Sequence, residues 1–248
     1  MSELLDSHQP LLAHLVELRT RLVRSALVFL VGFAASFFFS SQLYDFLVAP
    51  LAQAAPGGKL ITIGVVSPFF LQLKIAALAG FLLTLPHTLY QAWAFVAPGL
   101  YANEKRLVLP LVVSSSILFF IGMSFAYFFV FGVVFSFMAK TVPASMQWLP
   151  DSAEYFDFAL SMFVAFGLTF ETPVVVVLLV RMGVVTLKKL VEIRSYVIVG
   201  AFVVAAVVTP PDILSQLLLA IPLCLLYEVG LLAARWVQPV EKPEEVSA

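Results

Sequence analysis

The sequence predicts an all-α polytopic membrane protein with six transmembrane helices and both termini on one side of the membrane. Of its residues, 62% are hydrophobic and 12% are charged, and the mean hydropathy is +1.04, which lies outside the usual range of soluble domains. The apolar residues form runs long enough to cross a hydrocarbon core of about 30 Å. Positive residues collect on alternate connections between these runs, which gives the chain a predicted orientation.

The expected spans follow from the rule that about 20 apolar residues cross a bilayer as a helix. They cover roughly residues 22–40, 69–96, 107–138, 159–181, 195–209 and 214–235. The fifth run, between Arg194 and Pro210, is only about 22 Å long as a helix, and the sixth starts directly after the turn. We therefore expect short fifth and sixth helices that offer a surface to partner helices.

Prolines interrupt three of the expected spans, at Pro86, Pro173 and Pro222. Each removes a backbone donor and kinks its helix unless its surroundings compensate. Several kinked helices predict a concave, cup-like arrangement.

Lysine and arginine decide the orientation, because 11 of the 14 positive residues fall on one side of the expected spans. By the positive-inside rule this side is cytoplasmic, so both termini are expected in the cytoplasm. We expect one membrane domain over 1–237, with an interfacial arm at 1–21 and an outer cap at 41–68. The acidic segment 238–248 is expected to be a disordered cytoplasmic tail.

Several classes of function find no support in the sequence. Nucleotide, zinc-protease and nucleophile-elbow motifs do not occur, and the three histidines do not form a metal-binding pattern, so we expect no enzyme, cofactor or metal. The basic residues are confined to short loops, and the net charge is −1. Both observations argue against nucleic-acid binding.

Two acids in the basic segments are candidates for binding a cation. Glu17 lies in the arm, where the simplest interpretation is an i,i+4 pair with Arg21. Glu104 lies in the second loop, where it would also be favoured at the start of the third helix by the helix dipole. Together, two acids on one face are suited to receive guanidinium groups, which bind carboxylates through two parallel hydrogen bonds.

Five segments carry a resemblance to a known family. They are HLVELRTRL at 14–22, SPFF at 67–70, YQAWAFVAPGLYANEKR at 90–106, FGLTFETPV at 166–174 and TPPDILSQ at 209–216. The chain resembles the TatC family, the multispanning signal-peptide receptor of the twin-arginine protein translocase, over nearly its whole length. The resemblance implies a bacterial inner-membrane protein that binds twin-arginine signal peptides, recruits TatA and TatB, self-associates in a multimeric complex, and exports folded proteins using the proton-motive force.

The resemblance also implies roles for particular residues. Signal-peptide binding would fall to Glu17, Arg19, Phe95 and Glu104. Transport or conformational roles would fall to Pro50, Phe69, Glu171 and Asp212, and contacts with TatA and TatB to Thr209 and Gln216.

Structural interpretations remain open for several of these residues. Pro50 is also suited to shaping a turn, and Asp212 to capping the sixth helix. The Glu171 side chain could satisfy backbone that Pro173 leaves free, and a similar structural role is open for Glu228.

Two other functions remain alternatives. Glu171, Glu228 and Asp212 could form a proton path in a secondary transporter, because acids within membrane spans mark transport sites. No internal repeat accompanies them, which argues against that alternative. A purely structural assembly protein would have no affinity of its own for signal peptides.

Overall fold

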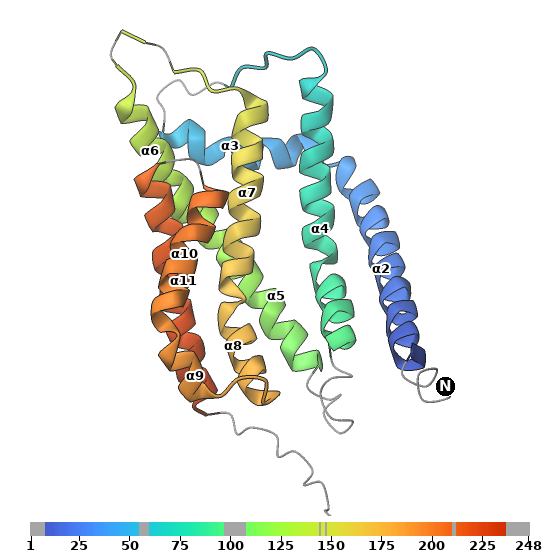
Figure 1. Ribbon diagram of the computed structural model, residues 1–248. Helices are drawn as coiled ribbons and strands as arrows, with labels where there is room; N and C mark the ends of the chain where they lie inside the picture. Colours follow the sequence, from blue (N-terminus) through green and yellow to red (C-terminus); the bar gives the residue numbers. More distant parts are fainter. Residues whose placement is uncertain are drawn as a thin grey trace, which may run out of the picture. The chain divides into compact units, whose positions relative to one another are not determined.

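The computed structural model describes residues 8–54, 60–96, 108–143, 145–146, 148–209 and 212–236. These residues form helices and one isolated bridge, between Ile61 and Asp151. In chain order the elements are α2 (His8–Phe37), α3 (Ser40–Ala54), α4 (Ser67–Val96), α5 (Val108–Phe125), the π-helix η3 (Ala126–Val130), α6 (Phe131–Thr141), α7 (Ser152–Phe170), α8 (Thr172–Arg181), α9 (Leu187–Glu192), α10 (Arg194–Val208) and α11 (Ile213–Ala234) (Figure 1).

Five helical segments are long and apolar enough to cross a membrane, which agrees with the sequence prediction. They are His14–Phe37, Ser67–Phe95, Val108–Thr141, Ser152–Arg181 and Ile213–Ala234. The shorter apolar helix α10, with 15 residues, takes the place of the expected fifth span. The all-helical, six-span prediction is therefore confirmed.

The arm and the first span form one continuous helix, α2, because Gly32, which packs closely, is the one glycine and no proline occurs between Leu11 and Phe37. One detail differs from the expectation. The expectation of a short sixth helix is wrong, since α11 has 22 residues and continues through Pro222. Of these two helices, only α10 is short.

The described chain groups into two compact units, whose boundaries fall within α3, α5 and α7 and in two connections, after residues 60 and 150. The first unit contains residues 1–49, 61–116 and 151–153, and the second contains 50–60, 117–150 and 154–248. The single membrane domain over 1–237 and the concave cup stay predictions, and the tail 238–248 lies outside the described residues.

In the first unit, α2 and α4 pack side by side and run antiparallel (Figure 1). Gly32 and Gly80 allow this close approach, because a Cβ atom on Gly80 would lie 2.6 Å from the backbone nitrogen of Phe33. Small residues at a crossing are the usual means by which membrane helices bring their backbones together. Further along α4, the Trp93 Nε1 donates to the Ser115 Oγ of α5 at 3.1 Å.

In the second unit, the π-helical turn η3 interrupts the third span between α5 and α6. Aromatic side chains surround the turn, and the Phe131 ring packs 5.1 Å from that of Phe163 on α7. A π-turn shifts the register of the side chains that follow, so α6 presents Phe131 and Phe135 to the interior.

The C-terminal part of this unit is built on α8, α9, α10 and α11. A buried cluster joins α8, α9 and α11 through Val176, Val180, Leu190, Tyr227 and Leu231. The Tyr227 hydroxyl donates to the Leu190 carbonyl at 2.9 Å, which gives the buried hydroxyl a partner.

Candidate functional site: a polar bridge between α2 and α4, and the α10–α11 hairpin

The Glu17 carboxylate is held on α2 by Arg21, one turn later. Its Oε1 accepts hydrogen bonds from the Arg21 Nε at 2.9 Å and Nη2 at 2.6 Å. The simplest interpretation of Glu17, an i,i+4 pair, is therefore confirmed. Because both bonds end on Oε1, Oε2 keeps accepting capacity, and it lies 3.8 Å from the His14 Nδ1.

Arg21 also reaches across to the neighbouring helix. Its Nη1 donates to the Gln91 Oε1 on α4 at 3.1 Å, so one guanidinium bridges two helices. Gln91 is 7% exposed, and its Nε2 lies 3.4 Å from the His87 Nε2 on the same helix. The bridge shields Arg21 more than Glu17, since their side chains are 22% and 34% exposed.

Phe95 lies beside this bridge, at the last described turn of α4. Its ring stacks on that of His14 with the centroids 4.2 Å apart and the planes 14° from parallel. The first unit thus brings Glu17 and Phe95, two of the expected site residues, to the same end of the α2–α4 pair. Arg19 is exposed and forms no ion pair with described residues. Glu104 lies outside the described residues.

Glu171 occupies the turn that separates α7 from α8. It is 8% exposed, and both of its carboxylate oxygens are closed off from solvent. The turn forms because Pro173 lies at the start of α8, a position where its missing N–H costs little. The sequence placed Pro173 inside a span, and the structure shows that it begins a new helical segment there.

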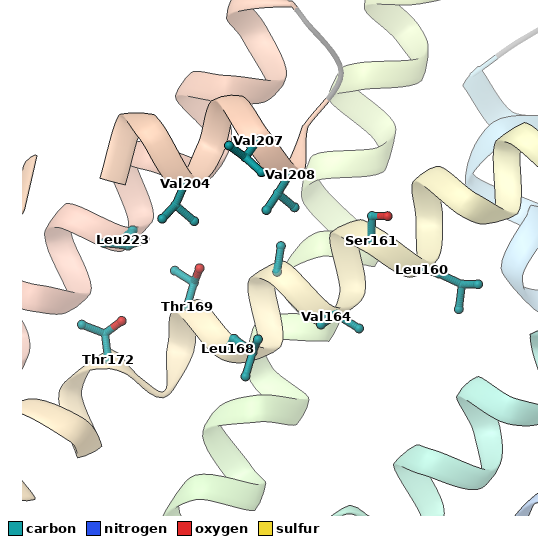
Figure 2. Close-up of a pocket in the computed structure, with 11 residues that line it drawn as sticks. Leu160, Ser161, Val164, Leu168, Thr169, Thr172, Val204, Val207, Val208 and Leu223 are labelled. Atoms are coloured by element: carbon teal, nitrogen blue, oxygen red, sulfur yellow. The ribbon is translucent and has the colours of Figure 1, made fainter. Parts of the chain in front are cut away.

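A groove opens beside this turn, between the α7–α8 segment and the α10–α11 hairpin (Figure 2). Its volume is about 650 Å³. Figure 2 shows Val204 and Val208 of α10 directed toward the α7 face that carries Thr169. The lining is mostly apolar, with hydroxyl groups from Ser161, Thr169 and Thr172. The groove therefore suits an apolar helix or lipid chain rather than a charged solute.

Three expected site residues lie where α10 ends and α11 begins. The Asp212 Oδ1 accepts from the backbone N–H of Ser215 at 2.7 Å, which confirms the interpretation of Asp212 as an N-cap. The Thr209 hydroxyl is buried and donates to the Ala205 carbonyl at 2.8 Å. The Gln216 Nε2 donates to the Phe202 carbonyl at 3.2 Å, which ties α11 to α10.

At the other end of the hairpin, α10 and α11 are joined by an ion pair. The Arg194 Nη2 donates to the Glu228 Oε2 at 2.7 Å. The pair is partly exposed, with side-chain exposures of 40% and 45%, so solvent screens it. Glu228 thus has a structural partner within the hairpin.

Pro50 and Phe69, two further expected site residues, belong to α3 and to the start of α4. Pro50 is buried inside α3, so it does not shape a turn as the structural interpretation supposed. Phe69 is in the first turn of α4, where it is 57% exposed and packs edge-on to Phe70.

Within the described residues, His, Cys, Asp and Glu side chains do not gather in groups of three that could hold a metal ion. The long apolar helices and the buried polar bridge between two of them define the class: a multi-pass α-helical membrane protein. Comparison with known proteins then gives the family. The sequence profile of the family described as "Sec-independent protein translocase protein (TatC)" matches residues 13–222, and the chain belongs to this family.

Individual relatives agree with the profile. The chain is 46% identical over 242 residues to a protein of Haemophilus influenzae named Sec-independent protein translocase protein TatC, covering 97% of this chain and 94% of the relative. It is 46% identical over 232 residues to the Escherichia coli K12 protein of the same name, covering 93% and 90%. A crystal structure described as the twin arginine translocase receptor TatC superposes with a TM-score of 0.80 at 39% identity, covering 90% of this chain and 98% of that one.

Two features of the site were not predicted from the sequence. One is the Arg21–Gln91 bond, whose partners are 70 residues apart, and the other is the Arg194–Glu228 pair. Gln91 is one of a few polar residues in a mostly apolar span, which is the signal that marks it as a residue in need of a buried partner.

Proposed function

We propose that this chain is the core receptor and scaffold of a twin-arginine translocase and binds the arginine pair of a signal peptide through the region around Glu17. The observation that carries the proposal is the half-buried Glu17 carboxylate, which already binds one guanidinium through Oε1 and is 34% exposed. A group that binds Arg21 in this way has the geometry to bind an arginine of a peptide.

The preference for arginine follows from hydrogen-bond geometry. A guanidinium presents a planar fork of donors to a carboxylate, whereas the ammonium of lysine is a point charge. Partial burial strengthens these bonds relative to bulk water. Phe95, which lies next to Glu17 through its stack on His14, adds an aromatic face for the side chains that flank the arginines.

Glu104, Arg19 and the loop between α4 and α5 complete the proposed site. Glu104 would receive the second guanidinium, and Arg19, which is exposed on α2, would orient the arm. Membership of the family, with its bacterial relatives, supports a bacterial inner-membrane location, and the charge bias supports an orientation with this site and both termini in the cytoplasm.

The α10–α11 hairpin is the proposed contact surface for TatA and TatB. The short α10 leaves a mismatch with the bilayer that a docked single-span helix would relieve. Thr209 and Gln216 lie at the turn and bind α10 carbonyls, and the remaining acceptor of the Gln216 amide is suited to a partner helix. Self-association in a multimeric receptor belongs to the same proposal.

The proposed chemistry is non-enzymatic, with the proton-motive force as the energy source. Pro50, Phe69, Glu171 and Asp212 would act in conformational steps of transport. Glu171 is buried beside the groove, where an acid perturbs the local packing of lipid or helix. In the alternative secondary transporter, Glu228 and Asp212 would need to carry protons, yet each holds a structural bond within the hairpin.

Photocrosslinking tests the proposal in the membrane-embedded protein. Photoreactive residues are placed at Thr20, which is exposed on α2 one turn from Glu17, or at Asn103, next to Glu104, so that both carboxylates are kept. Val65, which is fully exposed before the start of α4, serves as the control position. A twin-arginine signal peptide should crosslink at Thr20 and Asn103 but not at Val65, and a twin-lysine peptide should lose the crosslinks. Equal crosslinking of the two peptides would refute arginine recognition at this site.

A further inference from the structure

Resting on the proposed function, we propose that Arg21 is an internal competitor for the signal peptide: its guanidinium occupies Glu17 in the resting protein, and an arriving arginine displaces it onto Gln91. This assigns Arg21 and Gln91 to the specificity of the receptor.

The bonds on Arg21 divide it between two partners. Nε and Nη2 donate to Glu17, while Nη1 donates to Gln91 on the other helix. When Arg21 leaves Glu17, it keeps its hydrogen bond to Gln91. The partly buried guanidinium therefore retains an acceptor. Gln91 itself is buried and held next to His87, so it stays in position as the anchor.

The contact on Glu17 is the one that a peptide arginine needs. Both Arg21 bonds converge on Oε1, and Oε2 lies 3.8 Å from the His14 Nδ1. A bidentate guanidinium requires both oxygens, so it cannot form in full while Arg21 holds Oε1. The ammonium of a lysine acts as a point charge and makes a single contact. It therefore compensates less well than a guanidinium for the two Arg21 hydrogen bonds that it would displace. Competition with Arg21 therefore penalises lysine more than arginine.

Three variants separate competition from scaffolding. Arg21→Gln removes the competitor, so the affinity for a twin-arginine peptide should rise by roughly threefold to tenfold and the preference over a twin-lysine peptide should shrink. Gln91→Met removes the anchor that receives displaced Arg21, so affinity should fall. In the double variant the Gln91 change should have no further effect, because no guanidinium remains to be received.

Arg24→Gln is the matched control, because Arg24 is exposed one turn further along α2 and the change removes the same charge. The experiment measures equilibrium binding of fluorescent twin-arginine and twin-lysine peptides to the full chain in lipid nanodiscs. Thermal unfolding of each variant monitors folding. Arg21→Lys serves as a second variant, since it keeps the charge but weakens the hold on Glu17 and should also raise affinity for the arginine peptide.

The outcomes distinguish a failure of this inference from a failure of the proposed receptor function on which it rests. If the unaltered chain binds neither peptide, the receptor function fails and the inference fails with it. If the unaltered chain selects arginine but Arg21→Gln and Arg21→Lys bind more weakly or equally, only the inference is overturned, and Arg21 is a scaffold. An equal gain from Arg24→Gln would overturn it too, because general charge repulsion would then explain the effect.

Discussion

Arg21 on α2 donates a hydrogen bond to the Gln91 amide on α4, across 70 residues of sequence. The same guanidinium binds Glu17, so the geometry of a candidate receptor carboxylate depends on a residue of another helix. The antiparallel pairing that allows this contact is fixed elsewhere along the same two helices by Gly32 and Gly80. The two glycines that bring α2 and α4 together and the carboxylate of Glu17 therefore belong to the same helix pair.

Gly80→Ala should destabilise the protein, because the new Cβ would lie 2.6 Å from the Phe33 nitrogen and 2.7 Å from its Cα. Backbone atoms cannot move aside as a flexible side chain can, so we expect a loss of about 1–3 kcal/mol and a lower Tm. Gly132→Ala is the control, since a Cβ there meets no atom within 4 Å. Fluorescence-detected unfolding in detergent compares the two, and an equal Tm for both would contradict the close crossing.

Asp212→Ala should lower the stability of the hairpin by about 1 kcal/mol, because the Ser215 N–H loses its cap. Asp212→Asn keeps a capping oxygen and should restore most of the Tm. If Asp212 also has a role in transport, Asp212→Asn will fold normally and still export a folded reporter poorly. Normal export with Asp212→Asn would limit the residue to capping.

Gln216→Leu should leave signal-peptide binding intact and weaken crosslinks to single-span partners. The change removes the bond to the Phe202 carbonyl and the amide offered to a partner, worth about 1 kcal/mol in lipid. Gln72→Leu, at an exposed position on α4, is the matched control and should change neither measurement. Unaltered partner crosslinks in Gln216→Leu would argue against the hairpin as the contact surface.

Glu171→Gln separates the receptor from the transporter alternative. The receptor account expects the variant to keep signal-peptide affinity, because Glu171 lies at the α7–α8 turn and not at the Glu17 region. A transporter would show proton-coupled uptake of a small solute by the isolated chain in liposomes, lost in Glu171→Gln. Observation of that uptake would contradict the receptor account.

The sequence predicted the class of fold well, because the length and composition of an apolar run depend on the bilayer alone. It also predicted the Glu17–Arg21 pair and the Asp212 cap, which are local along one helix. The Arg21–Gln91 and Arg194–Glu228 bonds escaped prediction, since they depend on which faces of distant helices meet. The expected sixth span, 214–235, nearly coincides with α11, which continues through Pro222 because its surroundings compensate. Only its description as short was wrong, because the shortness of the fifth run was extended to the whole hairpin.

The most direct test of the receptor account is equilibrium binding of a twin-arginine signal peptide and its twin-lysine counterpart to the chain in nanodiscs. We predict tighter binding of the arginine peptide, with the difference abolished in a Glu17→Gln and Glu104→Gln double variant that keeps the Tm of the parent. Equal binding of the two peptides to the unaltered, folded chain would contradict the account.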